Sequence, residues 1–332
     1  MRWQQGVASR ADRGFDATHM PDVSAIIVTR NTRELALASA KSVFRYADGL
    51  DEEVIVVDNG SGDDTVAALR DNCPGARCIR SERNLGFAKA VNLAARGSSA
   101  EFLLLLNSDA ELQPGTLGVA LEWMRRNPRC GVAGVQLLHP DGARQNSIAN
   151  FPTLATELLN KSLLRRLAPK RYPGKETRHE VPIEVETVVG AFMLIRKKAW
   201  DELEGLDERF FFFFEETDFC FRARSAGWST FHLPGASVVH GSGQSAKQVL
   251  PAARVEYWRS RYTYFEKNHG VAVSIVLRLG LGVRLVADWI AAMVANGILL
   301  GRSARWISRL DVCSTLLRWH LCGCPAATGL PR

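Results

Sequence analysis

Short apolar runs alternate with amphipathic stretches from residue 23 onward. The apolar runs are typical of strands, and the uninterrupted run at residues 102–106 suits a strand that is covered on both faces of a sheet. The predicted strands are residues 23–28, 54–57, 76–79, 102–106 and 131–138, and the predicted helices are residues 34–46, 65–72 and 88–95. This alternation predicts βαβ units and hence an α/β fold with parallel strands.

Polar residues follow three of these predicted strands. Residues 29–31 read Thr-Arg-Asn, residues 58–61 read Asp-Asn-Gly-Ser, and residues 107–109 read Asn-Ser-Asp. Ligands of such sheets bind at the carboxyl ends of the strands. Turn formation by Asn, Asp and Gly explains any one of these segments. It explains all three together poorly, so the sequence favours a ligand site at this edge.

A glycine-containing segment, residues 83–92, adds further candidate contacts. Gly86 would let the backbone approach a ligand closely, and a helix beginning near Phe87 would direct free N–H groups towards a phosphate or sugar oxygen. Asn84 and Asn92 lie on different turns of this segment. Taken alone, the pattern is also that of a simple helix cap.

A second carboxylate cluster follows an aromatic run at residues 210–214. This run leads into Glu215, Glu216 and Asp218. Five consecutive phenylalanines cannot all point to one side of an element, so some are expected to wall an apolar cavity beside the carboxylates. Desolvation there would raise a carboxylate pKa towards a value useful for proton abstraction. Asp218 and Arg222 lie four residues apart on a predicted helix. An ordinary ion pair with a purely structural role explains this spacing as well as a role in the site does.

Composition narrows the function class. A chain of 332 residues with 46% apolar residues can form a sizeable core. The net charge of +7 is uneven, since eleven Lys or Arg stand against four Asp or Glu from Pro251 onward, and such a tail suits an anionic surface. Basic residues are not interleaved with an aromatic platform, so nucleic-acid binding has little support.

The cysteines and the first twenty residues indicate in which cellular compartment the protein is expected. Seven cysteines without a C-x-x-C pair indicate neither a disulfide framework nor a zinc site. The first twenty residues mix Arg and Asp without an apolar core segment, so no secretory signal is predicted. A reducing cytoplasm is therefore expected.

The C-terminal part raises the question of a membrane. Residues 271–300 are mostly apolar, but Arg278, Arg284 and Asp288 interrupt them. The longest uncharged stretch, residues 289–301, has thirteen residues, whereas a spanning helix needs about twenty. The arginines and nearby tryptophans favour a helix or helical hairpin that lies in the membrane interface. The alternative is that this helical region packs on the catalytic domain or on a second subunit. A homo-oligomer is therefore one of the possible states of the protein.

An insertion at residues 151–186 interrupts the α/β pattern. Its basic residues are Lys161, Arg165, Arg166, Lys170, Arg171, Lys175 and Arg178. The segment is predicted to be a solvated loop with a short helix, a mobile lid over the site, or a contact for acidic headgroups.

Four motifs together resemble those of a known family. Residues 57–61 read Val-Asp-Asn-Gly-Ser, residues 83–88 Arg-Asn-Leu-Gly-Phe-Ala, residues 107–110 Asn-Ser-Asp-Ala, and residues 213–222 Phe-Phe-Glu-Glu-Thr-Asp-Phe-Cys-Phe-Arg. In this order and spacing they resemble the signatures of the inverting GT-A glycosyltransferases of family 2. The branch they resemble contains bacterial rhamnosyltransferases and galactofuranosyltransferases of cell-surface polysaccharide assembly.

The resemblance implies a nucleotide-sugar donor and a Mg²⁺ or Mn²⁺ ion. Asp109 stands in the family's D-x-D position, so it is expected to hold the ion against the diphosphate. His240 is expected to approach the ion or the diphosphate, although a lone histidine is more often only hydrogen-bonded. Glu216 occupies the position of the family's general base, with Glu215 as its rival. The implied donor contacts are Thr29, Asn31, Asp58, Asn59, Asn84, Gly86, Asn92, Asn107, Ser108 and Asp109.

The predicted organisation follows from these assignments. A flexible arm at residues 1–21 precedes a GT-A catalytic domain at residues 22–270, and an amphipathic helical region occupies residues 271–332. The catalytic domain is expected to comprise a nucleotide half at 22–138, the basic insertion at 151–186 and an acceptor half at 187–270.

The function expected from the resemblance is transfer of L-rhamnose from dTDP-rhamnose, with inversion, to a hydroxyl of a saccharide or polyprenyl-linked saccharide. The enzyme would work at the inner face of the plasma membrane. A UDP-sugar transferase for galactofuranose or a hexose is the first alternative. A nucleotidyltransferase is another, but no Gly-rich basic loop follows the first strand. A catalytically silent, nucleotide-sugar-binding partner in a membrane assembly complex is the third, in which Asn107 and Glu216 would mark decay.

Overall fold

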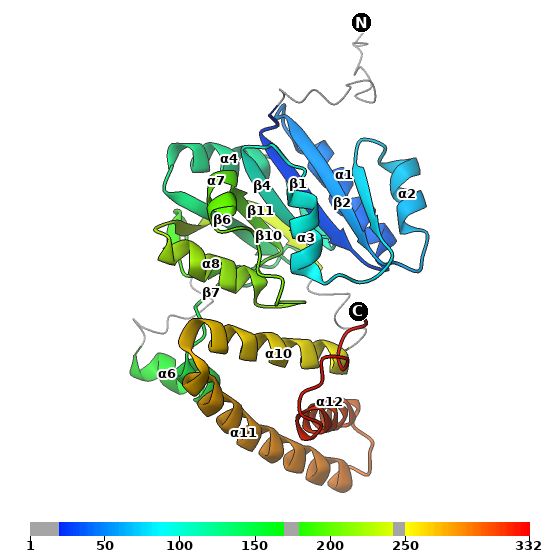
Figure 1. Cartoon of the computed structure of the whole chain (residues 1–332), viewed down its shortest axis with the longest axis vertical. Coiled ribbons are helices and arrows are strands. Elements are labelled where there is room, and N and C mark those ends of the chain that lie inside the picture. Colours follow the sequence, from blue (N-terminus) through cyan, green and yellow to red (C-terminus); the bar gives the residue numbers. More distant parts are fainter. Residues whose placement is uncertain (1–19, 169–178, 242–249) are drawn as a thin grey trace, which may run out of the picture.

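The structure is a computed structural model that describes residues 20–168, 179–241 and 250–332 (Figure 1). Nearly all of the expected N-terminal arm, residues 1–19, lies outside these ranges, as do Lys170, Arg171, Lys175 and Arg178 of the basic insertion. Within the described ranges, nine strands form one sheet in the order β3-β2-β1-β4-β10-β6-β11-β5, with β8 beside β11.

The first half of the sheet agrees with the predicted βαβ units, and the element ends differ by one or two residues. Strand β1 pairs in parallel with both β2 and β4, and β2 pairs in parallel with β3. The elements of this half are β1 (Val23–Thr29), α1 (Arg33–Arg45), β2 (Glu52–Asn59), α2 (Thr65–Asn72), β3 (Arg77–Ser81), α3 (Phe87–Ala95) and β4 (Phe102–Asn107). Thr29, Asp58 and Asn107 consequently lie at the carboxyl ends of three parallel strands, at one edge of the sheet.

The second half makes the sheet mixed. Strand β10 runs antiparallel to β4 and β6, and β5 runs antiparallel to β11. The elements of this half are β5 (Ala110–Leu112), α4 (Thr116–Arg126), β6 (Cys130–Leu138), α5 (Leu154–Leu158), α6 (Lys161–Leu167), β8 (Ile183–Val185), β10 (Phe192–Arg196), α7 (Lys197–Glu202), α8 (Glu215–Ser225) and β11 (Ser229–His240). A separate two-stranded sheet joins β7 (Ile148–Ala149) to β9 (Thr187–Val188).

Strand β11 is longer than the apolar pattern suggested. In the sequence, Pro234 and Gly235 interrupt the pattern directly ahead of the apolar residues 236–239. In the structure the pairing register with β6 shifts between Leu233 and Ser237, so the strand continues through the interruption. His240 is the last residue of β11, and β11 is parallel to β6. Its side chain thereby reaches the same edge of the sheet as Asn107.

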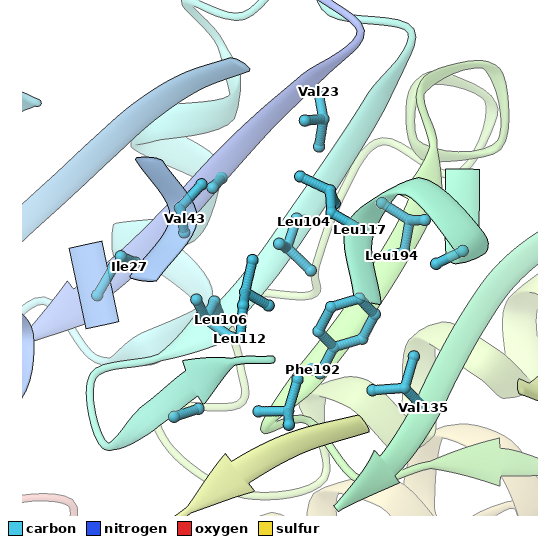
Figure 2. Close-up of a cluster of buried hydrophobic side chains, with 14 of the residues drawn as sticks. Val23, Ile27, Val43, Leu104, Leu106, Leu112, Leu117, Val135, Phe192 and Leu194 are labelled. Atoms are coloured by element: carbon cyan, nitrogen blue, oxygen red, sulfur yellow. The ribbon is translucent and has the colours of Figure 1, made fainter. Parts of the chain in front are cut away.

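Strand β4 shows why the central strand is apolar throughout. Phe102, Leu104 and Leu106 belong to one hydrophobic cluster, and Leu103 and Leu105 belong to another on the opposite face. Figure 2 shows the first cluster, in which these side chains pack with Leu117 of α4 and Phe192 of β10. Because successive strand residues point to opposite faces, a strand between two helical layers must be apolar at every position.

Three C-terminal helices form a third hydrophobic cluster beside the sheet. They are α10 (Leu250–His269), α11 (Val271–Ile298) and α12 (Ala304–Leu321), and Figure 1 shows them together below the sheet. Tyr264 of α10, Leu281 of α11 and Trp319 of α12 are buried in this cluster, together with Phe210 and Phe214. Helix α10 therefore packs with the two helices that follow it, and two of the five consecutive phenylalanines are anchored there.

The helical hairpin expected at the C-terminus is present as α11 and α12. In the described part of the chain, no helix combines the length and the apolar character that crossing a bilayer would require.

Candidate active site

The polar residues at the ends of β1, β2 and β4, which were predicted to bind the donor, converge at the carboxyl edge of the sheet. Thr29 is the register partner of Asp58, and Val28 is the partner of Asn107. The Thr29 hydroxyl lies 2.8 Å from that of Thr32, which in turn donates to the Ser108 hydroxyl at 3.4 Å. The ends of β1, β2 and β4 are therefore adjacent, as the three strand ends had predicted.

One carboxylate oxygen of Asp58 is buried and accepts no hydrogen bond from the described residues. Its side chain is almost completely buried, and Oδ1 accepts the Ser61 amide at 3.2 Å. Asp58 Oδ2 is buried and has no hydrogen-bond partner among the described residues. A buried carboxylate oxygen without a donor is costly. Asp58 is thus suited to accept a hydrogen bond from a ligand N–H group.

Asn31 shapes the loop over this carboxylate. Its backbone adopts φ +54°, a conformation that Asn tolerates better than most residues. The Asn31 amide donates to the Ser61 hydroxyl at 2.9 Å, and Asn31 Oδ1 accepts the Gly62 amide at 2.8 Å. Asn31 therefore holds the end of β1 against the loop after β2.

Asn59 and Asn84 build the next loop. The Asn59 side chain accepts the Leu85 amide at 2.7 Å and donates to Asn84 Oδ1 at 2.9 Å. Asn84 Nδ2 donates to the Pro331 carbonyl at 2.6 Å, so the C-terminal tail reaches this loop. These contacts account for both amide groups within the chain itself.

Gly86 permits a close approach, but to a protein group. At Gly86, with φ +83°, an added Cβ would lie 2.6 Å from Phe211 Cδ2. The expectation of free N–H groups at the start of α3 differs from the structure at Phe87, whose amide donates to the Phe211 carbonyl at 2.7 Å. The glycine in the sequence indicated that another group approaches the backbone closely at this position. In the structure that group is Phe211 of the aromatic run, and it occupies the Phe87 amide.

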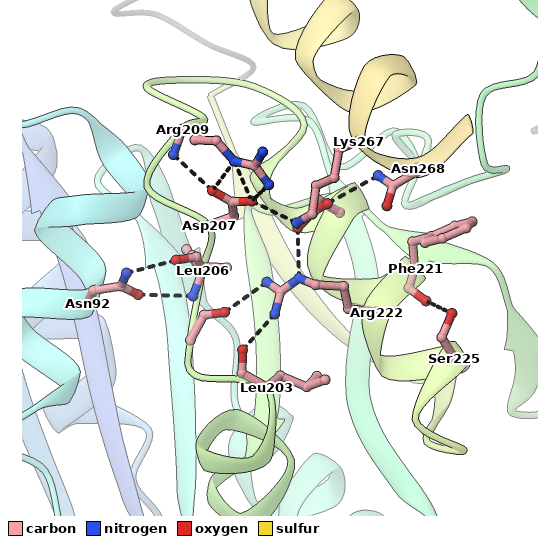
Figure 3. Close-up of polar contacts among 12 residues, drawn as sticks. Asn92, Leu203, Leu206, Asp207, Arg209, Phe221, Arg222, Ser225, Lys267 and Asn268 are labelled. Carbon is pink, nitrogen blue, oxygen red and sulfur yellow. Dashed lines mark hydrogen bonds and ion pairs between the residues drawn. The ribbon is translucent and has the colours of Figure 1, made fainter. Parts of the chain in front are cut away.

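Asn92 is used to hold a loop. Figure 3 shows its side chain paired with the backbone of Leu206. Asn92 Nδ2 donates to the Leu206 carbonyl at 2.8 Å, and Asn92 Oδ1 accepts the Leu206 amide at 3.0 Å. The nitrogen and the oxygen of the Asn92 side-chain amide are thus both bonded to the segment that leads to the aromatic run. The structure therefore does not bring Asn92 together with Asp58 and Asp109.

Asp109 and His240 form the second part of the site. Asp109 Oδ1 lies 3.4 Å from His240 Nε2, and both side chains are about nine-tenths buried, with exposed fractions of 8% and 10%. Strand β5 begins directly after Asp109, and Ala110 is the register partner of His240. The short β5 strand, which the sequence pattern did not predict, thus places these two residues side by side.

This pair could contribute two ligands to a divalent cation. The described residues include no group of three or more His, Cys, Asp or Glu side chains arranged to hold a metal. His240 Nε2 is buried and has no hydrogen-bond partner within the described chain. An unpaired imidazole nitrogen facing a carboxylate oxygen fits the donor set of a divalent ion such as Mn²⁺. The remaining positions would have to come from the ligand and solvent.

Helix α8 begins with Glu215, which is buried, and Glu216, which is half-buried. Phe213 and Phe214, directly before them, adopt φ +70° and +69°, which for such bulky residues stores about 1–3 kcal/mol of strain each. Burial raises the pKa of Glu216, and burial together with the charge of Glu216 raises the pKa of Glu215 well above its usual range. One Oε2 atom of each glutamate is buried without a partner in the described structure. Both carboxylates are therefore in the electrostatic setting expected of a proton acceptor.

A glycine connects Glu216 with the strand ends. A Cβ on Gly190 would meet Glu216 Cβ and Cγ at 3.6 Å. The next residue, Ala191, accepts the Asn107 amide at 3.1 Å. Glu216 and Asn107 thus lie on either side of residues 190–191. The two carboxylate clusters, about a hundred residues apart in sequence, approach each other here.

Asp218 proves to be part of a structural network. It is fully buried and pairs with Arg222 at 2.8 Å, with Lys267 at 2.8 Å and with Asn268 at 3.2 Å. Figure 3 shows this network between α8 and α10. The expected Asp218–Arg222 ion pair is present, and Lys267 extends it to the C-terminal helices.

One residue of the site has no signal in the sequence. The Gln145 side chain lies 3.0 Å from His240 Nδ1, from a loop 95 residues away along the chain. A single glutamine in an irregular loop carries no periodicity or motif. Only the folded structure reveals this contact.

Comparisons with known proteins agree with this architecture. Residues 24–204, more than half of the chain, match the sequence profile described as glycosyl transferase family 2. The N-acetylglucosaminyl-diphospho-decaprenol L-rhamnosyltransferase of Mycobacterium tuberculosis is 28% identical over 231 residues, which cover 65% of this chain and 75% of that protein. The dTDP-rhamnosyl transferase RfbF of Shigella flexneri is 22% identical over 259 residues, which cover 75% of this chain and 81% of that protein.

A solved structure shares the fold. The mannosyltransferase PcManGT from Pyrobaculum calidifontis, in complex with GDP-Man and Mn²⁺, is 16% identical and has a TM-score of 0.54, with 93% of this chain and 89% of that chain covered. The GT-A fold and the family profile point the same way, and the chain accordingly belongs to glycosyl transferase family 2 and is a glycosyltransferase.

Proposed function

We propose that this glycosyltransferase moves L-rhamnose from dTDP-rhamnose, with inversion, to a hydroxyl of a saccharide or polyprenyl-linked saccharide in cell-surface polysaccharide synthesis. The observation that carries the proposal is the arrangement at one sheet edge of two different buried groups. The Asp109–His240 pair suits a diphosphate with its cation, and Glu216 suits proton abstraction. Transfer from a sugar nucleotide requires both.

Glu216 is assigned as the general base. Its carboxylate would accept the proton of the acceptor hydroxyl while that oxygen attacks the anomeric carbon and the bond to the diphosphate breaks on the opposite side. The raised pKa makes Glu216 a stronger base than an exposed glutamate. Glu215 shares the buried environment, with its side chain on the same first turn of α8, and is the rival for this role.

Asp109 and His240 are assigned to the divalent cation. The cation, when bound, would offset the negative charge that the departing diphosphate gathers. Support comes from the unpaired His240 Nε2 facing Asp109 and from the Mn²⁺ in the structurally similar mannosyltransferase. Either Mg²⁺ or Mn²⁺ would serve in this role.

Asp58 is assigned to the base of the nucleotide. Its unpaired Oδ2 would accept the ring N–H that thymine and uracil both present. This contact does not distinguish dTDP from UDP. The preference for dTDP-rhamnose rests on the names of the relatives from Mycobacterium tuberculosis and Shigella flexneri, and a UDP-galactofuranose or UDP-hexose donor is the alternative.

The C-terminal helices are assigned to a membrane surface. Helix α11 exposes apolar side chains at helical spacing, among them Leu279, Val283 and Ile290, with exposed fractions of 68%, 74% and 50%. The exposed Arg284 and Arg302 lie within and just beyond this helix and would suit lipid phosphates. The Mycobacterium tuberculosis relative is named for a diphospho-decaprenol acceptor. An acceptor of that kind would place the enzyme at the inner face of the plasma membrane.

Ligand-dependent thermal stability tests the donor and cation assignments. The midpoint of unfolding would be measured with dTDP, UDP, GDP, dTDP-rhamnose and UDP-galactofuranose, each with and without Mg²⁺ or Mn²⁺, because a ligand that binds only the native state raises the midpoint. The expected result is a cation-dependent rise that is largest for dTDP-rhamnose and lost in Asp109→Ala. A larger rise with a UDP-sugar would change the donor and keep the mechanism. No rise with any ligand would favour a catalytically silent partner.

A further inference from the structure

The imidazole ring of His240 lies between Gln145 and Asp109. His240 Nδ1 is 3.0 Å from Gln145 Oε1, and Nε2 is 3.4 Å from Asp109 Oδ1. The two ring nitrogens of a neutral histidine differ, because one donates a hydrogen bond and the other accepts. Nε2 is the nitrogen that faces Asp109. Whether Nε2 donates or accepts a hydrogen bond therefore depends on what Gln145 presents to Nδ1.

The orientation of the Gln145 amide is determined by backbone carbonyls. Gln145 Nε2 lies 2.5 Å from the His240 carbonyl oxygen and 3.0 Å from the Leu138 carbonyl oxygen. Carbonyl oxygens can only accept hydrogen bonds, so the NH₂ group must occupy this side. The Gln145 oxygen must then face His240 Nδ1, and an oxygen there can only accept. The proton of the neutral ring is consequently on Nδ1.

The same contacts leave Nε2 as an acceptor that faces another acceptor. With the proton on Nδ1, the unprotonated Nε2 lies 3.4 Å from Asp109 Oδ1, and Nε2 has no hydrogen-bond partner among the described residues. Both side chains are about nine-tenths buried, so water screens their repulsion poorly. A divalent cation bound by both atoms would turn this repulsion into two coordinate bonds.

Gln145 is itself held in place by its surroundings. Its backbone amide donates to the Leu137 carbonyl at 2.8 Å, and its carbonyl accepts Gln136 Nε2 at 2.9 Å. Both contacts are to the end of β6, which pairs with β11 next to His240. A glutamine with a fixed backbone and a fixed amide orientation can impose one tautomer on its neighbour.

We propose that Gln145 is a positioning residue that holds His240 in the Nδ1–H tautomer, so that Nε2 is available as a ligand to the divalent cation. The proposal rests on the assignment of Asp109 and His240 to that cation. Hydrogen-bond partners of metal-bound histidines have this role in other proteins, and their removal typically weakens metal binding about 10–100-fold.

The tautomer is measured first, without metal. In ¹⁵N-histidine-labelled protein, two-bond ¹H–¹⁵N correlations distinguish the tautomers, and the His240 signals are those that disappear in His240→Gln. The wild type is expected to show Nδ1–H for His240. Gln145→Leu is expected to lose this preference. Asn146→Ala, on the same loop, is expected to keep it, because the Asn146 side chain donates to the Ile148 carbonyl. An Nε2–H tautomer in the wild type would overturn the proposal without any variant being made.

Metal affinity is the second measurement. The affinity for Mn²⁺ in the presence of dTDP would be determined by electron paramagnetic resonance of the free ion. Gln145→Leu is expected to bind about 10–100-fold more weakly than the wild type and Asn146→Ala, with unchanged circular dichroism. Equal affinity in Gln145→Leu and wild type would reject the role of Gln145. Absence of Mn²⁺ binding in the wild type would instead reject the cation assignment, while the tautomer measurement still tests the contact itself.

Discussion

The sheet edge and helix α11 leave opposite kinds of groups without partners. At the sheet edge the groups without a hydrogen-bond partner among the described residues are polar and buried, namely Asp58 Oδ2, His240 Nε2 and one oxygen each of Glu215 and Glu216. On α11 they are apolar and exposed, as at Leu279 and Val283. Each arrangement is costly for the isolated chain, through buried polar atoms in one case and apolar surface in water in the other.

The difference indicates which ligand each region suits. A buried polar atom regains its hydrogen bond or coordinate bond only from a polar ligand, so the sheet edge suits a nucleotide diphosphate, a cation and a hydroxyl. An exposed apolar row regains stability only from an apolar partner, so α11 suits a lipid interface. The Asp218–Lys267 contact connects α8, which carries Glu215 and Glu216, with α10, the helix that precedes α11.

The largest effect is expected at Glu216. Glu216→Gln removes the proposed proton acceptor and keeps the side-chain volume, so turnover should fall by about 10²–10⁴-fold. Donor binding should persist, because the donor contacts lie elsewhere. Steady-state rates and calorimetric donor affinity would be measured for Glu216→Gln and, as its matched control, Glu215→Gln. A larger loss of turnover in Glu215→Gln would transfer the role of base to Glu215.

The contact between the two regions is tested at Lys267. Its ammonium group bridges Asp218 at 2.8 Å and Asp207 at 2.7 Å. Lys267→Met leaves the buried Asp218 with fewer partners, although Arg222 remains, so the free energy of unfolding should fall by about 2 kcal/mol. Urea unfolding measures this change. Lys197→Met, which removes a pair with the exposed Asp201, should cost less than about 1 kcal/mol; equal losses would contradict a special role for the buried network.

The apolar row of α11 is tested with vesicles. Leu279→Glu and Val283→Glu together place two charges where lipid contact is proposed, and binding to anionic phospholipid vesicles should weaken at least about tenfold. Folding should be unaffected, because both positions are exposed. Leu93→Glu with Val119→Glu, at exposed apolar positions on α3 and α4, is the matched control. If both double variants bind vesicles like the wild type while the α11 variant dissociates a dimer, the row covers a second copy of the chain.

The smallest effect is a change in pH dependence at Glu215. Because its pKa is raised in the folded protein, the folded state holds a proton that the unfolded state has released. The resulting stabilisation is fully present below the unfolded pKa of about 4.5 and is lost as the pH rises through the folded pKa. Glu215→Gln should thus raise the unfolding midpoint of the ligand-free protein at pH 8 and change it little at pH 4. An equal shift at both pH values would indicate a packing effect instead.

Much of the fold follows from local patterns. The apolar runs located β1, β2 and β4, and helical spacing located α1, α2 and α3, because a strand or helix covered by other layers must be apolar at defined intervals. Elements without such an interval were missed or located only in part. Strand β5 has three residues, and β11 is interrupted by Pro234 and Gly235, yet these two strands place Asp109 beside His240.

What the amino-acid sequence determined on its own was the kind of chemistry. Strand ends with Asp58 and Asp109 at one edge, and glutamates after an aromatic run, follow from alternation along the chain and from motif order. The tertiary structure alone decided how each side chain is used. It engaged Asn92 and Gly86 with the protein itself and brought Gln145 to His240. It also left Asp58 Oδ2 and His240 Nε2 without a hydrogen-bond partner in the part of the chain that the structure describes. Such contacts depend on residues far apart in the chain, and no local pattern encodes that separation.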